Sequence, residues 1–119
     1  MFERIILTQI NPHVYLMDDH HEATGYIVVG SKKALVIDTM NGYEDVRAVV
    51  GTVTNLPIMV VNTHGHCDHI YGNVYFDCAY LHPADLPVAQ EHMRFPEFIA
   101  ECNKRGLQMP PFEPIRGGE

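Results

Sequence analysis

A strand, a helix and a second strand follow one another in the first half of the chain, and this order limits the fold more than any other feature. Residues 34–38 (ALVID) are almost wholly apolar, which is typical of a strand covered on both faces. Apolar side chains then recur at helical spacing through residues 43–53, until Pro57 interrupts the pattern. The apolar residues 57–62 (PIMVVN) predict a second strand. A β–α–β unit places a helix against a sheet, so the sequence predicts an α/β fold.

Shorter periodic segments surround this unit and predict the rest of the sheet and its helices. The residues between 25 and 38 form two β-branched runs around a Gly-Ser-Lys-Lys turn, which predicts a hairpin. Further strands are expected at residues 5–10, 13–17 and 79–82, and further helices at residues 68–76, 83–92 and 95–105.

The length and composition of the chain indicate one hydrophobic core. The chain has 119 residues, of which 46% are hydrophobic, and a chain of this size buries roughly two-thirds of its unfolded surface. Residues 109–119 (MPPFEPIRGGE) contain three prolines and two glycines, a composition typical of a connector. We therefore expect a partial domain over residues 1–108 and a linker or truncated tail over residues 109–119.

Net charge, the length of the apolar runs and cysteine content make several partners and locations less favoured. Eight Lys and Arg residues against fifteen Asp and Glu residues give a net charge of −7, which disfavours a nucleic-acid partner. No apolar run reaches the ~18–20 residues of a membrane span. The N-terminus does not resemble a secretion signal, and three cysteines (Cys67, Cys78 and Cys102) have no paired spacing, so we expect a cytoplasmic protein.

Four potential metal ligands follow directly after the strand at residues 57–62, namely His64, His66, Asp68 and His69. Imidazole nitrogens and carboxylate oxygens suit zinc and neighbouring first-row metals. In an extended segment, His64 and His66 point to the same side and can hold one ion together. Asp68 and His69 are adjacent and diverge, so we expect them to reach a second ion. A single histidine or aspartate in a loop is usually solvated or caps a helix, but four together predict a metal site.

The segment from His64 to His69 (HGHCDH) resembles the HxHxDH signature of the metallo-β-lactamase fold superfamily, and the resemblance extends over residues 23–85. It implies the N-terminal half of an αββα sandwich, a mixed sheet with helices packed on one face. It further implies that His64 and His66 bind a first metal ion, and that Asp68 and His69 bind a second. Asp38 would contact the histidine loop from behind these ligands and orient it.

The resemblance also implies a function. Members of this superfamily hydrolyse an ester, thioester, lactone or related bond of a small-molecule substrate through a metal-activated hydroxide, which Asp68 would orient as the catalytic residue. The implied cofactor is Zn²⁺, in a two-ion centre when complete, with iron or manganese as alternatives. A further histidine, a bridging aspartate and a last histidine come from the C-terminal half of the family's domain, and this chain lacks them. The alternative is therefore an inactive half-domain that associates with a second copy, as a homo-oligomer, or with a complementing C-terminal half.

Overall fold

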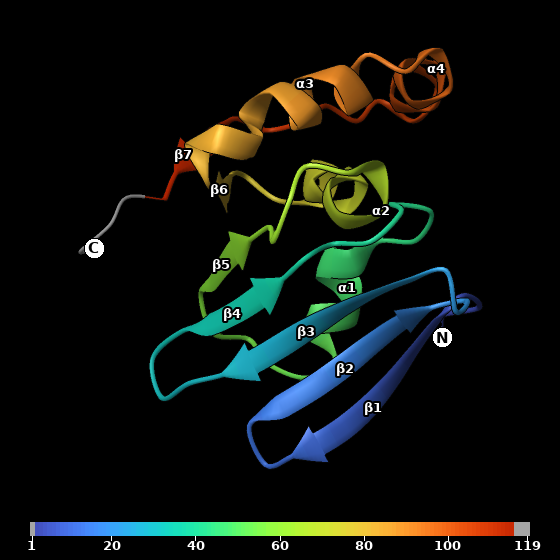
Figure 1. The fold of residues 1–119 in the computed structure, drawn as a ribbon. Helices are drawn as coiled ribbons and strands as arrows, with labels where there is room; N and C mark the ends of the chain where they lie inside the picture. Colours follow the sequence, from blue (N-terminus) through green and yellow to red (C-terminus); the bar gives the residue numbers. More distant parts are fainter. Residues whose placement is uncertain (1, 116–119) are drawn as a thin grey trace.

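Within residues 2–115, which the computed structural model describes, seven strands form one mixed sheet in sequence order (Figure 1). The strands are β1 (Ile5–Asn11), β2 (Val14–Asp19), β3 (Ala23–Val29), β4 (Ala34–Ile37), β5 (Ile58–Val61), β6 (Ala79–Leu81) and β7 (Phe112–Pro114). Neighbours from β1 to β4 pair antiparallel, whereas neighbours from β4 to β7 pair parallel. The prediction of an α/β fold with a mixed sheet is therefore confirmed.

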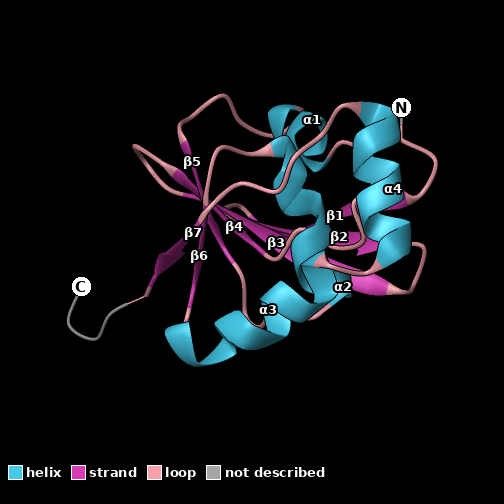
Figure 2. Cartoon of the chain, turned by 90° about the horizontal axis from the view of Figure 1, so that it is seen from above, coloured by secondary structure: helices cyan, strands magenta, loops and turns pink. Residues whose placement is uncertain are grey.

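Short helices connect the parallel strands. They are α1 (Val46–Gly51), α2 (Cys67–Ile70), α3 (Leu86–Met93) and α4 (Pro96–Arg105), with 3₁₀ turns η1 (Tyr71–Tyr75) and η2 (Pro83–Asp85). Figure 2 shows α2 beside α3 and α4. The ring of Tyr71, which follows α2, stacks on Phe98 of α4 with centroids 3.8 Å apart. None of the helices in residues 2–115 has the length and apolarity of a membrane span.

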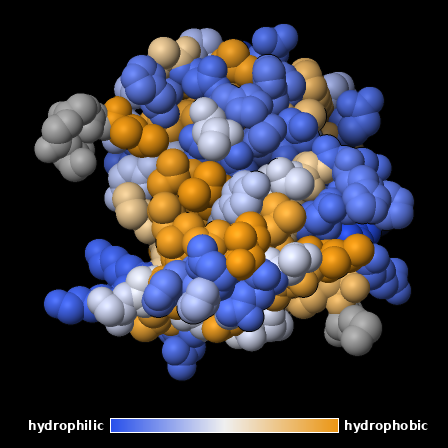
Figure 3. Space-filling view, turned by 60° about the horizontal axis from the view of Figure 1, so that its bottom comes forward, coloured by the Kyte–Doolittle hydropathy of each residue, from blue (hydrophilic) through white to orange (hydrophobic). Residues whose placement is uncertain are grey.

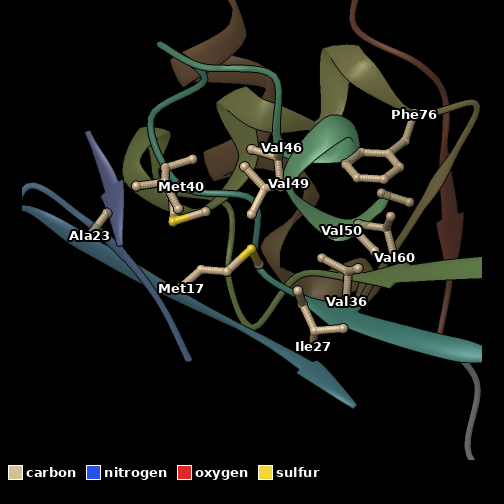
Figure 4. Close-up of a cluster of buried hydrophobic side chains, with 12 residues drawn as sticks. Met17, Ala23, Ile27, Val36, Met40, Val46, Val49, Val50, Val60 and Phe76 are labelled. Carbon is tan, nitrogen blue, oxygen red and sulfur yellow. The ribbon is translucent and has the colours of Figure 1, made fainter. Parts of the chain in front are cut away.

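The hydrophobic core lies between α1 and one face of the sheet (Figure 4). Met17, Ile27 and Val36 come from three adjacent strands and have no exposed surface. They face the buried valines of α1, which are Val46, Val49 and Val50. The valines lie three and four residues apart, so they share one side of the helix and bury it against the sheet.

Helix α1 is shorter than the helical pattern of residues 43–53 predicts. The side chain of Asp45 accepts a hydrogen bond from the amide of Ala48 at 3.0 Å and caps the helix, which therefore begins at Val46. Tyr43 precedes the cap and is 58% exposed. The capping bond therefore sets the start of α1 at Val46, whereas apolar spacing alone predicts a start at Tyr43.

The segment expected as a linker contains a strand. Phe112 to Pro114 form β7, which pairs parallel with β6 at the edge of the sheet. Pro114 is tolerated there because an edge strand has one row of unpaired backbone groups. The prolines of this segment favour a connector, and composition alone gives no information on pairing with a distant strand. Residues 116–119 lie outside the described part of the chain, and the domain boundary at residue 108 stays a prediction.

The second face of the sheet carries apolar side chains that no helix of the described chain covers. Paired positions place Leu16, Tyr26 and Ile37 in one row across β2, β3 and β4. Leu35 and Met59 lie side by side in a neighbouring row. Tyr26 and Met59 are 39% and 40% exposed, and a hydrophobic band is visible on the surface in Figure 3. We call this side of the sheet the outer face.

The substitution Ile27→Ala tests the position of the core. Ile27 is fully buried, so the variant should lose about 2–5 kcal/mol of unfolding free energy in a urea titration. Ile10→Ala is the matched control, because Ile10 is 55% exposed and its loss should change stability by less than about 0.5 kcal/mol. Equal losses in the two variants would contradict the placement of the core between α1 and the sheet.

Candidate metal centre

The ends of two parallel strands bring the potential ligands together. Asp38 follows β4 directly, and the histidine loop follows β5. The amide of Asp38 donates to the carbonyl of Val61 at 2.8 Å, which joins the two strand ends. This carboxyl end of parallel strands is where open α/β sheets place their ligands.

Three of the four predicted ligands converge. His64, Asp68 and His69 each offer a ligand atom, and these atoms lie within 4.8 Å of one another. The imidazole rings of His64 and His69 have centroids 3.8 Å apart, and His69 Nε2 lies 3.6 Å from Asp68 Oδ1. All three residues are half-buried, so solvent and a small ligand can reach them.

Asp38 is the hub of the hydrogen bonds behind these ligands. Its Oδ1 accepts a bond from the amide of Thr63 at 2.7 Å. Its Oδ2 accepts bonds from the Thr63 hydroxyl at 2.7 Å and from His69 Nδ1 at 2.8 Å. The Asp38 side chain is 7% exposed, so the carboxylate is stabilised almost entirely by these donors. Asp38 therefore contacts the histidine loop from behind, and its role in orienting metal ligands stays a prediction.

These bonds fix which nitrogen of each imidazole can bind a cation. A carboxylate only accepts, so His69 Nδ1 carries the proton and leaves the lone pair on Nε2. The Thr63 hydroxyl donates its hydrogen bond to Asp38. Its oxygen therefore accepts a hydrogen bond from His64 Nδ1 at 3.0 Å. The lone pair of His64 is then also on Nε2. Two imidazoles with free Nε2 atoms beside a carboxylate are a donor set that fits a divalent cation.

His66 stands slightly apart from the other predicted ligands. Its ring lies 4.8 Å from that of His64, at an interplanar angle of 90°. His66 does not belong to the three-residue group of close ligand atoms, which is formed by His64, Asp68 and His69. The close group therefore contains His64, which was predicted to bind the first ion, together with Asp68 and His69, which were predicted to bind the second. The division into two metal sites stays a prediction.

A buried amide network supports the same loop. Asn62 Nδ2 and the amide of Thr39 both donate to the carbonyl of His69, each at 2.9 Å. Asn73 exchanges hydrogen bonds with Asn62 and accepts one from the Thr39 hydroxyl at 2.7 Å. Asn62, Thr39 and Asn73 are all at most 2% exposed. The network holds the backbone of His69 while Asp38 holds its ring.

Sequence reasoning missed this network, although one signal was present. Asn62 is a polar residue at the end of an apolar strand, and a buried amide needs hydrogen-bonding partners. Gly72 adds a steric requirement, because a Cβ atom there would lie 2.1 Å from the carbonyl oxygen of Thr39. These residues are far apart in sequence, so their contacts could not be read from local patterns.

Comparisons with known proteins identify the fold. No family model and no curated protein sequence matches the chain. The structure is similar to the DIM-1 metallo-β-lactamase (TM-score 0.66, 16% identity, 79% of this chain and 49% of that chain). It is also similar to a metallo-β-lactamase from Erythrobacter litoralis (0.64, 20%, 77% and 47%) and to FIM-1 from Pseudomonas aeruginosa in its mono-zinc form (0.60, 19%, 98% and 53%). The chain spans about half the length of these solved structures.

The substitution Asp38→Asn tests the role of the hub. Asparagine tolerates the left-handed backbone of residue 38 (φ 65°), but its amide nitrogen cannot accept bonds from Thr63 and His69. We expect Zn²⁺ affinity, measured by competition with a chromophoric chelator, to fall about 10–100-fold. Asp77→Asn is the control, because the Asp77 side chain is 95% exposed. Unchanged affinity in Asp38→Asn would show that the hub does not orient the ligands.

Proposed function

Because the chain has the fold of the N-terminal half of metallo-β-lactamases, we propose that it is the metal-binding half of a metal-dependent hydrolase. The observation that carries the proposal is the convergence of His64, Asp68 and His69 at the end of a parallel strand pair. The hydrogen bonds that Asp38 and Thr63 accept from the imidazoles of His69 and His64 support it, because they leave both Nε2 atoms available.

The chemistry follows from the donor set. A bound divalent cation supplies Lewis acidity, which lowers the pKa of a water molecule and polarises the carbonyl or phosphoryl oxygen under attack. His64, Asp68 and His69 would hold one cation, and His66, whose ring lies beside that of His64, would be a ligand for a second ion. The Asp68 side chain is 42% exposed, so its carboxylate can accept a hydrogen bond from the attacking water and orient it.

The substrate class in this proposal is a small molecule with an ester, thioester, lactone or related bond. Zn²⁺ is the preferred cofactor because imidazole and carboxylate ligands suit it, with iron or manganese as alternatives. Three protein ligands and a water satisfy one zinc ion, whereas a second ion needs additional donors. These donors would come from a second polypeptide half. A cytoplasmic location belongs to the proposal, since Cys67, Cys78 and Cys102 are free thiols and suit a reducing compartment.

The variant His69→Ala tests the metal site. The wild-type chain should bind about one Zn²⁺ by elemental analysis, because three protein ligands and a water complete one tetrahedral site. His69→Ala removes one ligand of the close group, so its zinc content should fall toward zero. Zinc-dependent hydrolysis of a generic ester such as p-nitrophenyl acetate should fall with it. His20→Asn, in the exposed β2–β3 turn, is the control for the loss of an imidazole. Full zinc content and turnover in His69→Ala would refute the proposal.

The second candidate function is an inactive half-domain that associates through its sheet. The outer face favours it, because rows of apolar residues cross several strands, and large exposed apolar patches mark interaction sites. In this alternative, a second copy of the chain or a complementing C-terminal half covers the outer face. Metal ligands from the partner would then decide whether the assembly is active.

The double variant Tyr26→Lys, Met59→Lys tests this association. Lysines on the outer face would be costly to bury, so a self-associating wild type should become monomeric in light scattering. Ile99→Lys is the control, because Ile99 is 44% exposed on α4, away from the outer face. If the wild type associates and the double variant associates equally, the outer face is not the interface.

A further inference from the structure

Helix α3 rests directly on the loop that carries the potential ligands. A Cβ atom built on Gly65 would lie 2.6 Å from the amide nitrogen of Ala89 and 2.9 Å from its Cα. Ala89 lies in the middle of α3 and is fully buried. Only a glycine in the loop allows this approach of two backbones, since any side chain would push the helix away.

The two ends of α3 place an acceptor on each side of His66. At its N-terminal end, Asp85 Oδ2 accepts a hydrogen bond from the amide of Gly65. At its C-terminal end, His92 Nδ1 accepts a hydrogen bond from the amide of Cys67 at 2.9 Å. The residues immediately before and after His66 are therefore both tied to one rigid element.

We propose that Asp85 and His92 are positioning residues, which fix the backbone on either side of His66 and thereby direct its imidazole toward the metal centre. The role rests on the proposed function, because His66 needs a defined direction only if it binds a cation. Neither residue belongs to the HxHxDH segment, and neither is part of the close group of ligand atoms.

His66 is the ligand with the greatest need for such support. The rings of His64 and His69 are held by Thr63 and Asp38, whereas His66 takes its direction from the backbone at the start of α2. Its backbone is extended there (φ −71°, ψ 151°), and its side chain makes no capping bond to the helix. Fixing the amides of Gly65 and Cys67 restricts the backbone on both sides of His66, and so restricts the direction in which its side chain leaves the backbone.

His92 is itself held firmly enough to act in this way. The Tyr71 hydroxyl donates to the His92 carbonyl at 2.6 Å, and burial raises the pKa of Tyr71, so the phenol keeps the proton that it donates. The imidazole packs against Phe95, with ring centroids 4.6 Å apart. Its centroid lies 5.2 Å from that of His66, so the two rings are also neighbours.

Two substitutions of His92 separate positioning from space filling. His92→Phe keeps a ring against Phe95 but removes the acceptor, whereas His92→Asn removes the ring but places an amide oxygen where Nδ1 stands. We expect Co²⁺ affinity to fall about tenfold or more in His92→Phe, with an altered visible spectrum of the bound ion, and to be largely restored in His92→Asn. In the metal-free chain, hydrogen exchange of the Cys67 amide should be faster in His92→Phe than in His92→Asn.

The controls distinguish failure of this inference from failure of the proposed function. His13→Phe makes the same substitution in the β1–β2 turn and should keep wild-type affinity, spectrum and exchange. A wild-type chain that binds no Co²⁺ would refute the metal site and with it the role of His92. A wild type that binds Co²⁺, with His92→Phe equal to it in affinity, spectrum and exchange, would refute the positioning role alone. If His92→Phe does not fold, Asp85→Ala decides, because it removes the acceptor of Gly65 and should weaken Co²⁺ binding in the same way.

Discussion

The carboxylate of Asp38 is the interaction on which the site depends. It lies at the end of β4 and accepts hydrogen bonds from the backbone and hydroxyl of Thr63 and from the ring of His69. Through the Thr63 hydroxyl it also determines the proton position on His64. One buried carboxylate thus links the ends of two parallel strands and leaves the Nε2 atoms of two imidazoles free. Because its donors lie in the loop that follows β5 and in α2, the charge is stabilised only when the β4–β5 pair has formed.

The parts of the structure that sequence reasoning predicted correctly depend on short-range patterns. The apolar run at residues 34–38 and the valines of α1 follow strand and helix patterns, and both elements form, although α1 is shorter than its pattern predicts. The histidine motif stands out in composition and spacing, and three of its four candidate residues lie close together, while their role as metal ligands stays a prediction. The fold was correctly predicted because its β–α–β unit and its histidine motif both lie within a few dozen residues.

The parts that could not be predicted depend on contacts between distant segments. The segment containing Phe112 was expected to be a linker because of its prolines, yet it pairs with β6 more than thirty residues earlier. Asp85 and His92 reach backbone amides of the histidine loop, about twenty and twenty-five residues away respectively. The periodicity of apolar residues in the sequence does not indicate these hydrogen bonds, because each depends on how α3 packs against Gly65. Side-chain acceptors of this kind can be identified only in the folded structure.

The direction of the apolar rows on the outer face has a thermodynamic consequence. The rows run across β2, β3, β4 and β5 rather than along any one strand, so they include both antiparallel and parallel neighbours. A partner that covered them would contact both kinds of pairing and would need both to be intact. A partner that covered the outer face would therefore stabilise the folded sheet, by a free energy that grows with the logarithm of the partner concentration.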